Sequence, residues 1–221
     1  MDEAGDSEIS VGISLPPRSN DVLFGPGADW QANACVNFGM PEVAYQDGFR
    51  RAAYYLAERV CDTGREQDFL IYPIVFLYRH HIELALKSLI SLGSFLLDRK
   101  LGEADRRTIS RHDLCNLWKL AMPLLNQVCE WSGEGALPPA DLEGIDSYIR
   151  QLHAHDPDGQ RFRYARTRKQ ASSLNPALRN INIRDFAIAL EKLADYLDAL
   201  ETWFDQLADH KNEMLADYRS E

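Results

Sequence analysis

The feature that most constrains the fold is a long apolar segment, residues 69–93, which also carries charged residues at helical spacing. Its apolar residues recur every three or four positions and fall on two adjoining faces: Val75, Tyr78, Ile82, Leu86 and Leu89, and Ile74, Leu77 and Leu84. This period predicts a helix, and apolar residues on adjoining faces predict that the helix is buried. The rest of the chain must therefore supply the helices that cover it.

A polar ladder runs along the same predicted helix. Arg79, Glu83 and Lys87 follow one another at intervals of four, and His80 stands three positions before Glu83. Cations one turn on either side can neutralise a glutamate within its own helix. Because a buried charge is costly unless it is paired, we expect the ladder to be internal and Glu83 to contact another segment.

Residue types exclude several kinds of site. The four cysteines form no CxxC pair and no Cys/His zinc spacing, so we expect reduced thiols in a cytoplasmic protein. His80 and Glu83 reverse the Glu-x-x-His order that di-metal bundles use, and no second pair occurs. We therefore expect no metal and no cofactor. The net charge of −10 also excludes a generally basic surface, so RNA or DNA would need a local patch.

Neither a leader nor a membrane span is expected. The first ten residues, MDEAGDSEIS, are acidic and precede no hydrophobic run, unlike an ordinary signal peptide. The polar ladder interrupts the one segment that approaches the roughly 20 apolar residues of a membrane helix. Both observations favour a cytoplasmic protein that does not contact a membrane.

Two regions are expected. Residues 1–40 combine proline, glycine and acidic residues, which predicts an extended N-terminal arm. Phe24, Trp30 and Phe38 are too apolar for a fully solvated tail, so we expect the arm to dock in part. Residues 41–221 have helical periodicity and form the second region, a helical domain.

About five helices and no strand are expected in that domain, which makes the fold all-α. The predicted helices cover about 41–64, 69–99, 112–131, 138–152 and 182–207, with a polar connection at 99–111 and a long irregular loop at 155–181. His112 and Asp113 mark the third helix start, where Asp113 completes a capping box opened by Ser110. Pro123 should kink or divide that helix. Asn182 should cap the last helix, whose long apolar stripe indicates packing on a second subunit.

The irregular loop is basic. It holds six basic residues against Asp156 and Asp158, although the chain as a whole is acidic. Its candidate binding residues are Arg161, Arg163, Tyr164, Arg166 and Arg168. Cations interleaved with aromatic rings can bind phosphates beside a stacking platform. The alternative is a solvated loop whose arginines pair with acidic residues elsewhere.

Two arginines precede a histidine by five positions, Arg107 before His112 and Arg150 before His155. In a ribonuclease the histidine would act as acid or base on a ribose hydroxyl, and the arginine would hold the phosphate. Chance alone gives roughly one or two such pairs in a chain with six histidines and many arginines, so the spacing does not establish a nuclease. We expect Arg150 and His155 to share a face only if their helix loosens before the following turn.

The order of these motifs resembles the HEPN-like helical domains. The resemblance rests on FLYRHHIELALKSLI, then RHDLCNLWKL, then DPDGQRFRY, then a long terminal helix. More narrowly, the chain looks like a set of uncharacterised bacterial proteins, through GADWQANA, YQDGFRRAAYYL, YPIVFLYRHHIEL and INIRDFAIALEKLADYLDAL. Together these segments span residues 27–200.

The resemblance implies a bundle of four to five helices that is commonly a homodimer. Many members are metal-independent ribonucleases of toxin–antitoxin, abortive-infection or CRISPR-linked systems, and their Arg–His motif matches Arg150 to His155 and Arg107 to His112. Others lack catalysis and act as binding or dimerisation modules. Ala165 departs from the proline that relatives are expected to have after Phe-Arg-Tyr.

Three interpretations remain open at this point. The first is a dimeric HEPN-like binding or regulatory module that engages RNA, a nucleotide or a protein partner encoded nearby, in a defence or toxin–antitoxin context. The second is a metal-independent HEPN ribonuclease. The third is a ligand-free structural scaffold.

Overall fold

The computed structural model describes residues 19, 23–36, 39 and 41–220, and the chain divides into two compact units, Met1–Gly39 and Met40–Glu221. In the first unit, the described residues include a short 3-10 helix, η1 (Trp30–Ala32), which Asp29 caps by accepting a hydrogen bond from the backbone N–H of Gln31 at 3.2 Å. Much of the predicted arm, including Phe38, lies outside the described residues. Its docking stays a prediction.

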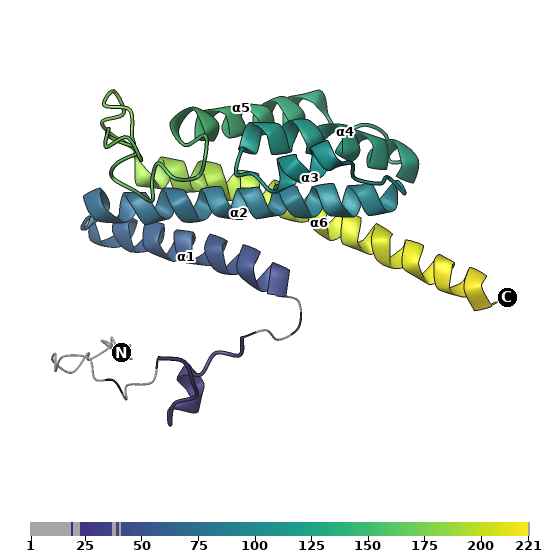
Figure 1. Cartoon of the computed structure of the whole chain (residues 1–221), viewed down its shortest axis with the longest axis horizontal. Coiled ribbons are helices and arrows are strands. Elements are labelled where there is room, and N and C mark those ends of the chain that lie inside the picture. The colour runs from purple at the N-terminus through teal and green to yellow at the C-terminus, as the bar shows by residue number, and fades with distance from the viewer. Residues whose placement is uncertain (1–18, 20–22, 37–38, 40, 221) are drawn as a thin grey trace. The chain divides into compact units, whose positions relative to one another are not determined.

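The second unit is an all-α bundle, and the described part of the chain contains no strand, so the predicted fold class is confirmed. Its described residues form six helices (Figure 1): α1 (Pro41–Thr63), α2 (Gln67–Leu96), α3 (Glu103–Ile109), α4 (Leu114–Ser132), α5 (Pro139–His155) and α6 (Ile183–Ser220). The short α3 occupies the segment that we expected to be a polar connection. Acidic residues in its first turn and arginines in its last turn both favour a helix there.

Helix α2 is the centre of the bundle, as its apolar period predicts. It packs against α1, α4 and α6 (Figure 1), and Ile74, Tyr78 and Leu86 on it are fully buried. Among the described residues, α2 is the one helix long and apolar enough to cross a bilayer by length and composition. Half of its most apolar window is buried inside the bundle, and the core helix of a soluble protein passes the same test.

The start of α4 differs from the predicted capping box. Asp113 is itself the N-cap, and its carboxylate accepts a hydrogen bond from the backbone N–H of Asn116 at 3.0 Å. Ser110 instead donates its hydroxyl to the carbonyl of Arg107 at the end of α3. Pro123 does not divide α4, which continues to Ser132. Burial of the α4 face against α2 offsets the cost of the missing backbone donor.

Helix α6 begins as predicted, because Asn182 accepts a hydrogen bond from the backbone N–H of Asp185 at 3.1 Å. It runs for 38 residues, well beyond the predicted end near residue 207. Lys211 on α6 donates to the carbonyls of Phe95 and Leu96, both at 2.9 Å, and so satisfies two acceptors at the C-terminal end of α2.

Residues 156–182 connect α5 to α6 without a helix, which confirms the predicted irregular loop (Figure 1). The loop contains one isolated antiparallel bridge, between Arg166 and Ser172. It is anchored by Phe162, which is 6% exposed and packs beside Tyr72 of α2. The loop therefore covers one end of α2 and holds its basic residues at the surface.

Candidate functional site

Arg79 organises a buried polar network between α2, the loop and the start of α4. Its side chain is 2% exposed, and it donates to the carbonyl of Asp156 at 3.0 Å, to the carboxylate of Glu83 at 3.1 Å and to the carbonyl of His112. Gly159 lies against it: a Cβ there would approach Arg79 Nη1 to 2.7 Å. Arg79 therefore fixes the entry to the loop.

Glu83 is the acidic member of this network and is 1% exposed. Its Oε1 atom accepts hydrogen bonds from Lys87 Nζ and from His112 Nδ1, each at 2.8 Å. Burial alone raises the pKa of Glu83, but the hydrogen bond and charge of Lys87, and then those of His112, outweigh it and leave the pKa below its ordinary value. The predicted burial of Glu83 and its contact beyond α2 are confirmed.

The histidine that reaches Glu83 is not the one in the ladder. His80 instead packs between the rings of Phe49 and Phe76, with centroids 4.5 and 5.8 Å away, and its burial lowers its pKa. His112 holds the position beside Glu83, and its side chain is 54% exposed. From the sequence, His112 was placed at a helix start and paired with Arg107 but was not connected with Glu83, although the need of Glu83 for an external partner was a usable signal.

The structure does not bring Arg150 and His155 together. Helix α5 stays regular to His155, and the backbone N–H of Asp156 donates to the carbonyl of Leu152 at 2.8 Å, so the loosening that would let the two side chains share a face is absent from this helix. Residues five apart in a helix are separated by roughly 140° around its axis. Arg150 accordingly pairs with Asp146 at 2.5 Å on another face.

The candidate binding residues of the loop line one surface depression of about 880 Å³, which we call the basic hollow. It is lined by Asp158, Gln160, Arg161, Arg163, Tyr164, Arg166, Thr167, Arg168, Lys169 and Ser173. Five of these residues are cations and one is an acid. Tyr164 is 53% exposed, and the guanidinium of Arg163 lies over its ring, 5.4 Å from the centroid.

Backbone and aromatic contacts hold the hollow's arginines, leaving their charges largely unneutralised. Arg161 donates to the carbonyl of Ser173 at 2.9 Å and Arg166 donates to the carbonyl of Gln170 at 3.1 Å. Arg163 lies 5.1 Å from the centroid of the Phe76 ring.

Acidic neighbours are scarce in the hollow. Within the described residues, its closest ion pair joins Arg161 to Asp158 at 3.9 Å, and Arg168 and Lys169 contact no acidic side chain. The alternative of a loop whose arginines pair with an acidic surface is not what the structure contains.

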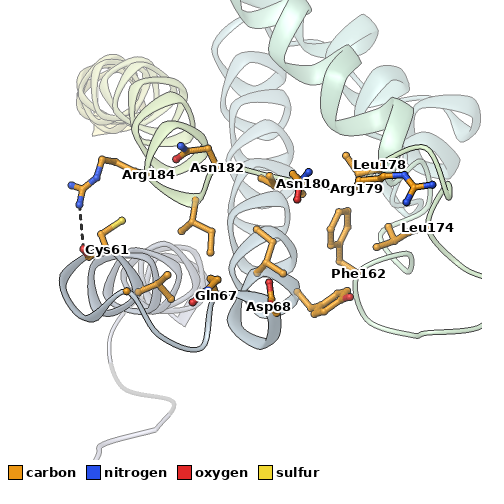
Figure 2. Close-up of a pocket in the computed structure, with 16 residues that line it drawn as sticks. Cys61, Gln67, Asp68, Phe162, Leu174, Leu178, Arg179, Asn180, Asn182 and Arg184 are labelled. Atoms are coloured by element: carbon orange, nitrogen blue, oxygen red, sulfur yellow. Dashed lines mark hydrogen bonds between the residues drawn. The ribbon is translucent and has the colours of Figure 1, made fainter.

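A groove of about 720 Å³ lies next to the loop, between the end of α1, the start of α2 and the start of α6. Figure 2 shows Arg184 on one side, hydrogen-bonded to the carbonyl of Cys61 at 3.3 Å, and Arg179 on the opposite side. Phe162 of the loop closes part of the wall. The groove carries mixed polar groups: the cations Arg179 and Arg184 and the carboxylate of Asp68, so it has fewer cations than the basic hollow.

A metal centre is not formed by the described residues, which contain no group of three or more His, Cys, Asp or Glu side chains able to hold an ion. Comparison with known proteins found no matching family model, no matching curated protein and no matching solved structure. The function therefore has to be inferred from the geometry of the basic hollow and of the buried network beside it.

Proposed function

We propose that the chain is a HEPN-like binding module that holds single-stranded RNA in the basic hollow. The observation that carries this proposal is the set of five cations and one exposed tyrosine in a single depression on an acidic protein. Cations that follow a phosphate backbone, with an aromatic ring on which a base can stack, are the usual elements of single-strand binding. Binding energy would come mainly from release of counterions from the phosphates.

RNA fits the hollow better than a mononucleotide does. The cations from Arg161 to Lys169 are spread over a depression of about 880 Å³, which offers contacts to more than one phosphate. The negative charge elsewhere on the chain opposes binding outside this patch. The resemblance to HEPN-like domains supports a cytoplasmic module of a defence or toxin–antitoxin system, with a protein partner encoded nearby.

We further infer that α6 joins two copies of the chain into a homodimer. Beyond Lys211 the helix continues with Met214, Leu215 and Tyr218, which are 49%, 41% and 81% exposed. A second α6 would bury these side chains in a two-fold contact. Light scattering of Leu215→Glu should give a monomer mass where the unaltered chain gives a dimer, and a monomeric unaltered chain would refute the inference.

A metal-independent ribonuclease is the competing function, and one contact favours it. Glu83 accepts a hydrogen bond from Nδ1 of His112, which orients a half-exposed imidazole as a general base would be oriented. The catalytic residue would then be His112 and not His155. A single imidazole cannot both remove the hydroxyl proton and protonate the leaving oxygen in one step, so the symmetry-related copy would have to contribute.

One experiment separates the two functions. Labelled single-stranded RNA is incubated in EDTA with the unaltered chain, with the hollow variant Arg168→Gln/Lys169→Gln, and with His112→Ala, and both retention and cleavage are measured. A matched control, Arg106→Gln/Lys119→Gln, removes the same charge from exposed positions that do not line the hollow.

The binding module predicts that RNA is retained intact by the unaltered chain, by His112→Ala and by the control, and that the hollow variant retains less. Cleavage that is lost in His112→Ala would establish the nuclease. Equal retention by the hollow variant and its control would refute the proposed binding surface. A protein that neither retains nor cleaves RNA would leave the ligand-free scaffold.

A further inference from the structure

The groove of about 720 Å³ beside the loop shares no lining residue with the basic hollow. Its volume is within the range of roughly 300–1,000 Å³ of clefts that hold ligands. Apolar residues of α1, α2, the loop and α6 line it: Val60, Ile71, Tyr72, Phe162, Leu178 and Ile183. Ile71 and Leu178 are half-buried and Tyr72 is 46% exposed, so part of this apolar surface stays uncovered. Apolar groups of a ligand would bury it.

Charged side chains of both signs line the same groove without an ionic partner. The side chains of Asp68 and Arg179 are exposed and make no hydrogen bond or ion pair within the described residues. Arg184 donates to the carbonyl of Cys61, which leaves its charge unneutralised. In the view of Figure 2, Asp68 lies between the two arginines. Because this carboxylate repels a polyanion such as RNA, the groove favours a ligand that carries both charges.

The backbone on one side of the groove is also unpaired. Arg179, Asn180 and Ile181 line the groove just before α6 begins, and their N–H and C=O groups make no hydrogen bond within the described residues. Each of these groups is a strong donor or acceptor. An extended peptide offers the complementary groups, and peptide recognition commonly joins main chains by hydrogen bonds while pockets hold the side chains.

We propose that the groove binds an extended peptide segment of a protein partner. The main chain of the peptide pairs with residues 179–181, and its apolar side chains lie against Ile71 and Phe162. An acidic residue of the peptide meets Arg179, and a basic residue meets Asp68. A peptide combines main-chain donors and acceptors, apolar side chains and both charges, whereas a nucleotide lacks the positive charge. The inference does not depend on binding of RNA in the basic hollow.

Three blocked tetrapeptides are the probes: acetyl-Lys-Leu-Val-Glu-amide, acetyl-Glu-Leu-Val-Lys-amide and the uncharged acetyl-Gln-Leu-Val-Gln-amide. Both orders of charge are used, because a peptide can pair with a backbone in either direction. Titration of the full chain with each is followed by ¹⁵N–¹H spectra, in which the signals of residues 179–181 should shift. The better of the charged peptides should bind about fivefold more tightly than the uncharged one, because it gains two exposed ion pairs.

Two double variants test the charges. Asp68→Asn/Arg179→Gln removes both charges from the groove, so the preference for a charged peptide should disappear. Asp62→Asn/Arg65→Gln is the matched control, because it removes the same two charges from exposed positions nearby that do not line the groove. The control should keep the preference. All four residues are exposed, so both variants should fold.

A second pair of variants tests the place of binding. Asn180→Trp would fill the groove and should abolish binding of all three peptides. Ala177→Trp, at an exposed position of the same loop that does not line the groove, should bind them as the unaltered chain does.

Four results would overturn the proposal. They are equal binding of charged and uncharged peptides, failure of all three peptides to bind, a preference that survives Asp68→Asn/Arg179→Gln, and binding that survives Asn180→Trp. Adenosine monophosphate is a fourth probe of the unaltered chain. If it binds in the groove more tightly than every peptide, the groove is a nucleotide site and the proposal is wrong.

Discussion

The buried Arg79 contacts the loop that carries the arginines of the basic hollow, but Arg79 and those arginines have opposite surroundings. Arg79 is 2% exposed, and its guanidinium donates to Glu83, to Asp156 and to the carbonyl of His112. Arg168 is exposed, and its side chain makes no hydrogen bond or ion pair within the described residues. The charge of Arg79 is neutralised by its partners and fixes the loop. The charge of Arg168 stays in water, where it costs little free energy, and remains available to a ligand.

The difference predicts that stability and ligand binding depend on different arginines. A buried ion pair that loses one partner leaves an uncompensated charge in a medium of low dielectric constant. An exposed cation that is removed leaves only water. Variants in the network should therefore lower the free energy of unfolding without removing the cations of the hollow. Variants in the hollow should weaken binding of RNA and leave the free energy of unfolding unchanged.

The largest effect is expected for Glu83→Gln. This change leaves Arg79 and Lys87 without their carboxylate and should reduce the free energy of unfolding by about 3–5 kcal/mol. Urea denaturation measures it. The control is Glu103→Gln, which breaks an exposed pair with Arg107 and should have little effect. Equal reductions in the free energy of unfolding would show that the buried network stabilises the fold no more than an exposed ion pair does.

A smaller loss is expected for Gly159→Ala. Gly159 has φ +71, and a Cβ would lie 2.7 Å from Arg79 Nη1, so strain and a clash add to about 2–3 kcal/mol. Gly135→Ala separates the two causes, because Gly135 has φ +80 but nothing within 4 Å of the added carbon. Its loss should be about 1 kcal/mol. If both variants melt alike, Gly159 is not packed on the network.

The next effect is the pH dependence of stability. Arg79, Lys87 and His112 face Glu83, and the pKa of Glu83 in the folded chain is below its ordinary value of 4.5. A lowered pKa contributes stability that is present above the unfolded value and lost as pH falls through the folded one.

The unaltered chain should therefore lose stability below about pH 4.5, and Glu83→Gln should lose less over the same window. Thermal melts between pH 3 and pH 6 measure both. Parallel curves for the two proteins would show that the neighbours of Glu83 do not lower its pKa in the folded chain.

The smallest effect is expected for the hollow variant Arg168→Gln/Lys169→Gln. Both side chains are exposed and make no hydrogen bond or ion pair within the described residues, so the free energy of unfolding of this variant should stay within about 0.5 kcal/mol of that of the unaltered chain. Urea denaturation again gives the value. A loss as large as that of Gly159→Ala would mean that the hollow is part of the structural core.

The sequence predicted those features that depend on local period and missed those that depend on packing. The burial of Arg79 and Glu83 follows from the apolar residues around them on one helix. The partner His112 lies 29 positions from Glu83 and meets it only because α4 packs on α2. A second contact of this kind joins α1 to α6: Arg50 donates to the carboxylate of Glu191 at 3.0 Å across 141 positions, and it depends on how the two helices align.

Two local features differ from what the sequence allowed, and each has a physical reason. Arg150 and His155 were expected to share a face only if the turn after residue 155 loosened α5, and that condition is not met, because the proline and the glycine of the turn lie beyond the last helical residue. Ser110 was expected to cap α4, but its hydroxyl bonds back to α3, a helix whose seven residues gave too short a pattern to identify. The turn after residue 155 and the hydroxyl of Ser110 were each compatible with two local structures, and neighbouring residues decided which one forms.

The salt dependence of RNA binding tests the central claim most directly. If Arg168 and Lys169 contact phosphates, removing both should reduce the slope of log K against log salt by about 1.4, which is roughly 0.7 for each contact with a single strand. The control Arg106→Gln/Lys119→Gln should keep the slope of the unaltered chain. A slope that is unchanged in the hollow variant, or that falls equally in the control, would contradict binding in the basic hollow.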